Sequence, residues 1–145
     1  MKNERKINVL VVEDNPADSR LIVNALSERC GIETCAAVDD GEKALCFLNK
    51  EGDYSNLKDP DLIILDLNLP KRSGFEILDF VKNSDKLNMI PVVILSTSDS
   101  GADILKAYKL RANSYVVKPA ELEDFLSSVA GVGKYWSEIS ARPVM

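Results

Sequence analysis

The sequence predicts a doubly wound α/β domain in which five parallel strands alternate with five helices. Two runs, 62–65 and 92–95, are apolar at every position, which is typical of strands buried on both faces of a parallel sheet. Segments with the helical spacing of apolar residues lie between the apolar runs. This alternation calls for right-handed crossovers between neighbouring parallel strands.

The chain has the size and composition of one globular domain. It has 145 residues, of which 46% are hydrophobic, and a formal net charge of −5. The negative charge disfavours general binding to nucleic acid. The apolar runs are too short for a signal-peptide core or a membrane span, so we expect a cytoplasmic protein that does not associate with a membrane.

Cysteine and histidine usage limits the chemistry that the chain can perform. Cys30, Cys35 and Cys46 match no metal-ligand spacing, and their odd number favours reduced packing residues over a disulfide framework. The chain contains no histidine, which is the commonest general base. Any functional site must therefore use carboxylates, hydroxyls and lysine.

Short apolar runs bounded by polar or turn residues predict the strands. Only Asn8 interrupts the first run, and Pro91 opens the fourth. A polar linker at 50–60, longer than an ordinary loop between a helix and a strand, leads to the central run. We therefore expect strands at 7–12, 33–38, 62–65, 92–95 and 114–117.

Recognisable starts and stops predict the helices. Asn15 and Pro16 form a typical N-cap and first helical residue, and Gly31 ends the helix that they begin. Gly131 and Gly133 lie within the last helix, which we expect to continue toward Ile139. We expect four further helices. One follows the turn at 39–41, one runs from Gly74 to about Ser84, one passes through 104–110, and the last begins near Ala120.

Polar side chains follow the strands directly, and the strand order decides whether they meet. The flavodoxin-like order 2-1-3-4-5 places the carboxyl ends of strands one and three side by side, where ligands bind in open α/β sheets. Glu13 and Asp14 then converge with Asp66. Ser96 and Lys118 complete the ring from strands four and five.

Three clustered carboxylates require a cation. Two like charges about 4 Å apart repel by roughly 4 kcal/mol at the effective dielectric of a protein surface. Mg²⁺ suits such a site because it prefers oxygen ligands and is held by one or two carboxylates. We expect Asp14, Asp66 and a backbone carbonyl after Asp66 to bind it, while Lys118 and Ser96 face an anionic ligand.

At these residues the sequence resembles the receiver domain of two-component response regulators. The resemblance covers about residues 6–130 and implies one receiver domain at 1–145, with a C-terminal helical extension at about 131–145. The residues that carry it are Glu13 and Asp14, Asp66 with Pro70 and Gly74 behind it, Ser96 after Pro91, Tyr115, and Lys118 with Pro119.

The resemblance implies a phosphoryl acceptor. Asp66 would take a phosphoryl group from a histidine kinase, and the protein would signal through its surface without an output domain. Asp14, Asp66 and the backbone carbonyl of Asn68 would hold Mg²⁺, with Glu13 assisting through water. Beyond catalysing its own phosphorylation and dephosphorylation, such a domain is not an enzyme.

The same resemblance assigns the phosphoryl-binding and switch residues. Ser96 would bind a phosphoryl oxygen and Lys118 would pair with it. Tyr115 would be the aromatic switch together with Ser96, although its position suits packing in a strand equally well. The family pattern makes Lys118–Pro119 a cis peptide, whereas Pro119 on its own indicates a helix start. Thr97 and Ser98 suit helix capping.

Within the family the chain looks most like receivers that partner phytochrome-type histidine kinases. The linker at 50–60, the run 66–71 and the aromatic pair Tyr135 and Trp136 carry this likeness. Two departures stand out. Ser96 replaces the usual threonine, and Arg111 stands where glycine commonly ends the fourth helix, so that helix must end differently or accept strain.

Two alternative functions and one assembly remain open at this stage. A dehalogenase-type phosphatase would also use Asp66 as nucleophile, but Asn68 occupies the position of its second aspartate. A degenerate receiver would bind partners without phosphorylation. A homodimer could form through the face of helix four, strand five and the final helix, whose apolar residues are Leu122, Phe125, Val129, Tyr135 and Trp136. The alternative, which is strong for Leu122 and Phe125, is that these residues pack the final helix onto its own sheet.

Overall fold

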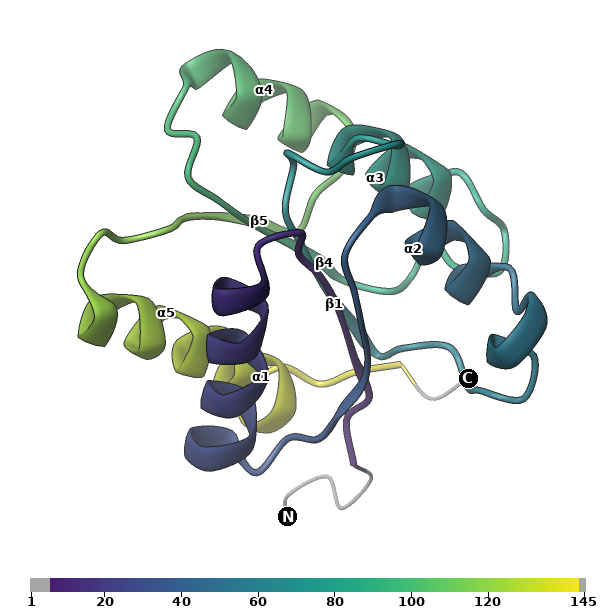
Figure 1. Cartoon of the computed structure of the whole chain (residues 1–145). Coiled ribbons are helices and arrows are strands. Elements are labelled where there is room, and N and C mark those ends of the chain that lie inside the picture. The colour runs from purple at the N-terminus through teal and green to yellow at the C-terminus, as the bar shows by residue number, and fades with distance from the viewer. Residues whose placement is uncertain (1–5, 144–145) are drawn as a thin grey trace.

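The computed structural model of the chain describes residues 6–143, which form one parallel sheet covered by helices on both faces (Figure 1). The strand order is β2-β1-β3-β4-β5, which confirms the predicted 2-1-3-4-5 arrangement. All neighbouring strands pair in parallel. The strands are β1 (Val9–Val12), β2 (Thr34–Val38), β3 (Leu62–Leu65), β4 (Val92–Ser96) and β5 (Ser114–Val117).

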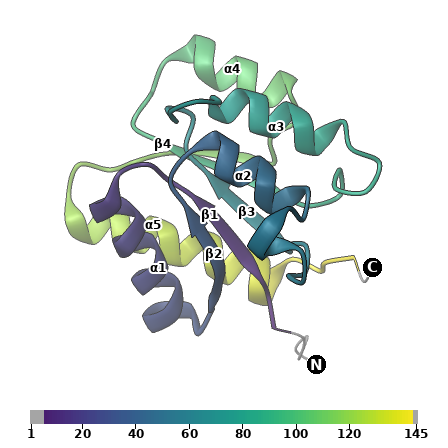
Figure 2. The same ribbon diagram turned by 45° about the vertical axis from the view of Figure 1, so that its right-hand side comes forward.

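Five α-helices connect the strands. They are α1 (Pro16–Cys30), α2 (Gly41–Leu48), α3 (Gly74–Lys82), α4 (Gly101–Lys109) and α5 (Leu122–Lys134). Figures 1 and 2 show α1 and α5 on one face of the sheet and α2, α3 and α4 on the other. The linker after α2 contains a short 3₁₀ helix, η1 (Gly52–Tyr54), and α5 continues into a π-helical turn, η2 (Tyr135–Ile139).

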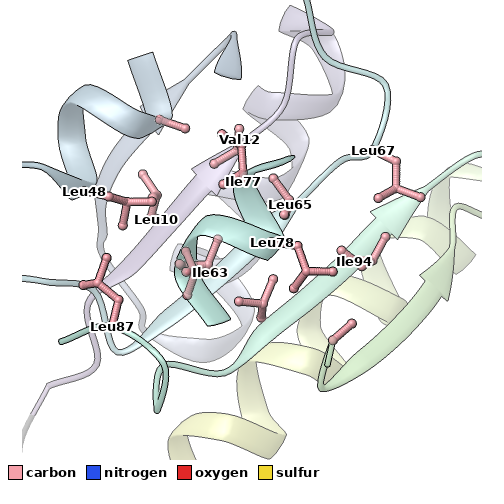
Figure 3. Packing of buried hydrophobic residues seen from close by; sticks show 14 of the residues in the cluster. Leu10, Val12, Leu48, Ile63, Leu65, Leu67, Ile77, Leu78, Leu87 and Ile94 are labelled. Carbon is pink, nitrogen blue, oxygen red and sulfur yellow. The ribbon is translucent and has the colours of Figure 1, made fainter. Parts of the chain in front are cut away.

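Alternating strand residues build two hydrophobic cores. Leu10 and Val12 of β1 face α2 and α3, whereas Val9 and Val11 face α1 and α5. Side chains of successive strand residues point to opposite faces, so a strand that is apolar at every position serves both layers. Figure 3 shows the core on the α2–α4 face, which includes Ile63, Leu65, Ile77, Leu78 and Ile94.

Local capping explains where the helices begin and end. The Asn15 side chain accepts a hydrogen bond from the Asp18 backbone N–H, and Gly31 ends α1 with a φ of 66°, as predicted. Ser73 and Glu76 form a capping box at the start of α3. Arg111 adopts a φ of 73° after α4, so this helix accepts a left-handed arginine.

The segment between β5 and α5 differs from both expectations for Pro119. No cis peptide bond occurs in residues 6–143, so the predicted cis Lys118–Pro119 bond is wrong. Proline makes the two isomers close in energy, and the surrounding structure selects one of them. Pro119 does not begin the helix either, because α5 starts at Leu122 with Glu121 as its N-cap.

The final helix packs closely on α1. A Cβ at Gly133 would approach Cys30 Sγ and a Leu26 methyl group to 2.9 Å, so glycine permits this contact. Phe125 and Val129 are buried in the core, so neither belongs to an exposed dimer face. For Phe125 this confirms the alternative that it packs the helix onto its own sheet, whereas for Leu122, which is exposed, that alternative is wrong. Phe125 and Val129 supply the apolar face that any helix on a sheet must bury.

Candidate functional site

The register of the sheet brings three carboxylates to one edge. Val12 of β1 pairs with Leu65 of β3, so Glu13 and Asp66 leave their strands at the same level. Glu13 and Asp66 are buried, whereas Asp14 is exposed. One carboxylate oxygen from each of these residues lies within 4.8 Å of the others.

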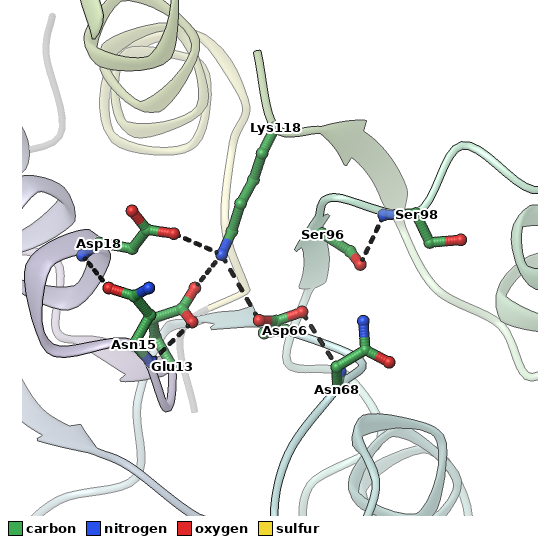
Figure 4. A network of polar contacts seen from close by, with 8 residues as sticks. All are labelled: Glu13, Asn15, Asp18, Asp66, Asn68, Ser96, Ser98 and Lys118. Carbon is green, nitrogen blue, oxygen red and sulfur yellow. Dashed lines mark hydrogen bonds and ion pairs between the residues drawn. The ribbon is translucent and has the colours of Figure 1, made fainter. Parts of the chain in front are cut away.

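Lys118 lies beside the Glu13 and Asp66 carboxylates, although it follows a different strand (Figure 4). Its Nζ is 2.6 Å from Glu13 Oε1, 2.9 Å from Asp18 Oδ2 and 3.5 Å from Asp66 Oδ2. The lysine side chain is only 5% exposed. Its backbone N–H donates to the Ser96 carbonyl at 2.7 Å, which fixes the chain as it leaves β5.

Burial and charge perturb the protonation of Glu13 and Lys118. Burial raises the pKa of Glu13 to about 7, even though the hydrogen bond from Lys118 lowers it. Burial alone would lower the pKa of Lys118, but its hydrogen bonds to Glu13 and Asp18 and the charge of Asp66 raise that pKa above its usual value. The lysine therefore carries its positive charge throughout the neutral range.

The loop after β3 fixes the backbone and the carboxylate of Asp66. The Asn68 backbone N–H donates to Asp66 Oδ1 at 3.3 Å, and the Gly74 N–H donates to the Leu67 carbonyl at 2.9 Å. A Cβ at Gly74 would collide with the Asp66 carbonyl oxygen and lie 2.6 Å from Leu67 Cα. Only glycine lets the start of α3 approach the backbone of Asp66 this closely.

Ser96 and Tyr115 are connected through the loop after β4. Ser96 is fully buried, and its Oγ accepts a hydrogen bond from the Ser98 N–H at 3.2 Å. The Tyr115 hydroxyl donates to the Ser98 carbonyl at 2.8 Å. The predicted capping role of Ser98 is wrong, because Ser100 is the N-cap of α4. Ser98 Oγ instead donates to Asp103 Oδ2 at 2.7 Å.

Most of the sequence-predicted residues meet in space, and one contact was missed. Glu13, Asp66 and Lys118 are in direct contact, and Asp14 belongs to the same acidic cluster. The missed residue is Asp18, which binds Lys118 across 100 positions of sequence. Its place in the first turn of α1 indicates only a favourable interaction with the helix dipole, so no sequence signal points to the pairing.

The acidic cluster fits a divalent metal. Its three carboxylates offer only oxygen ligands, which hard divalent cations prefer. Asp14 and Glu13 also line an open cleft between α1 and β2, together with Pro16, Ser19 and Arg20. Water has access from this side, as Mg²⁺ requires because it retains several water ligands.

The fold and the site agree on the class of protein: this is a receiver domain of two-component signalling. The response regulator receiver domain family matches residues 9–130, and the chain belongs to that family. Response regulators of this family receive a phosphoryl group from a histidine kinase in two-component signalling. This assignment decides against the dehalogenase-type phosphatase. Receiver domains are signalling modules rather than enzymes that act on an external substrate.

Individual relatives are similar over almost the whole chain. The response regulator Rcp1 of Synechocystis sp. is 39% identical over 135 residues, which cover 93% of this chain and 92% of Rcp1. The solved structure of the phosphorylated cyanobacterial phytochrome response regulator RcpA is 41% identical, with a TM-score of 0.92, covering 97% of this chain and 100% of RcpA. The Mn²⁺-bound structure of Rcp1 is 39% identical, with a TM-score of 0.88, covering 95% of this chain and 99% of Rcp1.

No helix within residues 6–143 is long and apolar enough to cross a bilayer.

Proposed function

We propose that Asp66 is the phosphoacceptor and that the reaction depends on Mg²⁺. The observation that carries this proposal is the buried Asp66 carboxylate, which lies beside two further carboxylates and 3.5 Å from the Lys118 ammonium. A carboxylate oxygen of Asp66 attacks the phosphorus atom, and the bond from phosphorus to the histidine of the kinase breaks. The product is an acyl phosphate on Asp66.

The surrounding residues have distinct roles in this reaction. Asp14, Asp66 and the backbone carbonyl of Asn68 would hold Mg²⁺, and Glu13 would contribute through water. The ion supplies positive charge that offsets the negative charge on the transferring phosphoryl group. Lys118 is positioned to pair with a phosphoryl oxygen, and a charge-assisted hydrogen bond of this kind is roughly twice as strong as a neutral one.

Ser96 and Tyr115 are proposed to report the phosphorylation state. The Ser96 Oγ accepts a hydrogen bond from the Ser98 N–H, and its own O–H is the group that can donate to a phosphoryl oxygen. Tyr115 is bonded to the carbonyl of the same Ser98. A change at Ser96 therefore acts on the loop that holds the tyrosine hydroxyl.

Mass spectrometry after incubation with Mg²⁺ and acetyl phosphate tests the assignment. The wild type should gain one phosphoryl group, and Asp66→Asn should gain none. Asp99→Asn, a substitution of an exposed aspartate in the loop before α4, is the matched control and should be phosphorylated like the wild type. Failure of the wild type to gain mass would support the degenerate receiver instead.

We infer that the kinase partner is of the phytochrome type. This inference rests on the relatives RcpA and Rcp1, the first of which is described as a cyanobacterial phytochrome response regulator. Phosphotransfer from a purified phytochrome-type kinase should exceed transfer from an unrelated histidine kinase at equal concentrations. Equal rates from the two kinases would contradict the inference.

A homodimer through α4, β5 and α5 is proposed as the assembly that responds to phosphorylation. Exposed apolar side chains gather on these elements: Leu105 and Tyr108 are 56% and 49% exposed, and Leu122 is 58% exposed. Tyr135, which follows α5, is also exposed, and its ring is in edge-to-face contact with that of Trp136 at 5.1 Å. A self-complementary contact is the commonest way to cover such a face.

A further inference from the structure

Asp18 is not one of the residues assigned to the proposed phosphorylation site, but its side chain contacts one of them, Lys118. Its carboxylate lies 2.9 Å from Lys118 Nζ (Figure 4). Its backbone N–H donates to the Asn15 side chain at 3.0 Å, so the N-cap of α1 fixes the backbone position from which the Asp18 side chain extends. The Asp18 side chain is 27% exposed, which places it at the solvent rim of the site.

The three contacts of the Lys118 ammonium are unequal. The distances to Glu13 and Asp18 are 2.6 and 2.9 Å, which are typical of charge-assisted hydrogen bonds. The distance to Asp66 is 3.5 Å, longer than such a bond. The ammonium is therefore held on the side of Glu13 and Asp18, and its third N–H only approaches the proposed phosphoacceptor.

We propose that Asp18 is a positioning residue that retains Lys118 in the unphosphorylated protein and gives it up when Asp66 is phosphorylated. This proposal rests on the assignment of Asp66 as phosphoacceptor. A phosphoryl group carries roughly two negative charges near neutral pH and competes for the ammonium. Asp18 is partly exposed, so water can replace the lysine when the pair separates.

The consequence is a bias toward the unphosphorylated conformation. The pair of Asp18 and Lys118 stabilises only the state in which the ammonium lies away from the phosphoryl position. A ligand that needs Lys118 must break this pair, and its affinity is lowered by the free energy of the pair. Removal of the Asp18 charge should therefore favour the phosphorylated conformation.

Beryllofluoride, a phosphoryl mimic, provides the test in calorimetric titrations at saturating Mg²⁺. Asp18→Asn should bind it about fivefold more tightly than the wild type, as expected from the loss of one partly exposed ion pair. Asp39→Asn is the matched control, because Asp39 follows β2 at the same sheet edge and pairs with Lys43 at 2.7 Å rather than with Lys118. It should change the affinity by less than twofold.

A double-mutant cycle separates competition for the lysine from the general effect of charge. In a Lys118→Met background, Asp18→Asn should gain no more affinity than Asp39→Asn does. Unchanged or weaker binding by Asp18→Asn, or an undiminished gain in the Lys118→Met background, would overturn the proposal. A wild type that binds no beryllofluoride overturns the Asp66 assignment, and this proposal with it.

Nitrogen NMR of the Lys118 ammonium gives a second readout that does not require Lys118→Met to bind the ligand. The Nζ resonance of the wild type should shift when beryllofluoride binds. In Asp18→Asn without ligand, the resonance should already lie closer to the bound position. A ligand-free Asp18→Asn resonance identical to that of the wild type contradicts retention of the lysine by Asp18.

Discussion

At the scale of single residues, buried charges dominate the energetics of the proposed site. Glu13 and Asp66 are almost fully buried, and the Lys118 ammonium is in contact with both carboxylates. Removal of one partner from a buried ion pair costs more than the pair itself contributes, because it leaves an uncompensated charge. The carboxylates and Lys118 therefore depend on one another whenever no metal is bound.

The first prediction concerns the metal. Asp14→Ala should weaken Mg²⁺ binding by about tenfold or more, because it removes one of the carboxylates proposed to hold the ion. It should not destabilise the metal-free fold, since the exposed Asp14 adds to the repulsion among the acidic groups. Calorimetric Mg²⁺ titrations and thermal unfolding in EDTA measure the two effects. Unchanged affinity would remove Asp14 from the site.

The second prediction follows from the pKa of Glu13, which burial raises from 4.5 to about 7. Between these two pH values the folded state binds more protons than the unfolded state. The free energy of unfolding should therefore fall as pH rises through this window, by up to roughly 3 kcal/mol without metal. Lys118 makes no opposing contribution between these two pH values. Its pKa is raised above the ordinary lysine value of 10.5, so its protonation changes only at higher pH.

Urea unfolding of the metal-free protein at several pH values measures this dependence. Glu13→Gln removes the titrating group and should flatten the profile between pH 4.5 and 7. An identical slope in the wild type and in Glu13→Gln would assign the pH dependence to other groups.

At the scale of elements, glycines and helix ends decide how closely segments approach one another. Gly74 begins α3 against the backbone of Asp66, whereas Gly101 begins α4 with open space around its missing Cβ. The ends of α3 and α4 are tied together: the Arg111 guanidinium donates to the Lys82 carbonyl at 2.7 Å, and the Lys82 ammonium donates to Asn113 Oδ1 at 2.9 Å. Burial lowers the pKa of Lys82.

The third prediction compares the two glycines. Gly74→Ala should destabilise the protein by about 2 kcal/mol, because the new Cβ forces the backbone at Asp66 and Leu67 to move. Gly101→Ala should be neutral or stabilising by up to about 1 kcal/mol, because alanine loses less conformational entropy and meets no atom within 4 Å. Denaturant unfolding measures both variants.

Phosphorylation of the same two variants separates a local effect on the site from general destabilisation. Gly74→Ala should also be phosphorylated more slowly at a temperature where it remains folded. Equal stability losses in Gly74→Ala and Gly101→Ala would show that the contact behind Asp66 has no special importance.

The fourth prediction concerns Arg111, which has a φ of 73°. From strain alone, Arg111→Gly should stabilise the protein, but the structure adds hydrogen bonds from the arginine to the Lys82 carbonyl and, at 3.2 Å, to Asn83 Oδ1. Both Arg111→Gly and Arg111→Ala lose these bonds, and only glycine relieves the strain. Arg111→Ala should therefore be less stable than Arg111→Gly by about 1 kcal/mol.

Thermal unfolding of the two Arg111 variants isolates the backbone strain, because the lost hydrogen bonds cancel between them. Equal stabilities of Arg111→Gly and Arg111→Ala would mean that the chain relaxes out of the left-handed conformation after substitution.

At the scale of the whole molecule, the proposed site and the proposed dimer surface lie on different parts of the same sheet. The site lies at the carboxyl ends of β1 and β3, whereas the exposed Leu105 and Tyr108 lie on α4 and the exposed Leu122 lies on α5. Figure 2 shows these two helices on opposite faces of the sheet. Tyr115 belongs to β5 between them and reaches Ser98 in the loop that follows Ser96. A rearrangement at Ser96 therefore has a short physical route to this surface.

The fifth prediction is that phosphorylation strengthens a homodimer. Sedimentation of the wild type should show self-association that increases with beryllofluoride, and the double variant Tyr135→Ala/Trp136→Ala should associate more weakly. Leu57→Ala, at an exposed leucine of the linker before β3, is a control that should behave like the wild type. A wild type that stays monomeric at high concentration in both states would end the dimer proposal.

Local chemistry accounts for the parts of this molecule that the amino-acid sequence determines by itself. Continuous apolar runs identify the buried strands, Asn15 and Gly31 mark the ends of α1, and the alternation of strands and helices implies a parallel sheet with right-handed crossovers. The sequence also places Asp14 and Asp66 directly after two of these strands, and parallel strands bring their carboxyl ends to one edge.

Only the tertiary structure decided the contacts between distant segments. Asp18 and Lys118 are 100 positions apart, and Arg111 reaches Lys82 across 29 positions. The trans peptide at Pro119 and the exposure of Leu122 belong to the same group. Caps and strand patterns depend on neighbours a few residues away, whereas these contacts depend on the packing of helices against the sheet, which sets where each side chain ends.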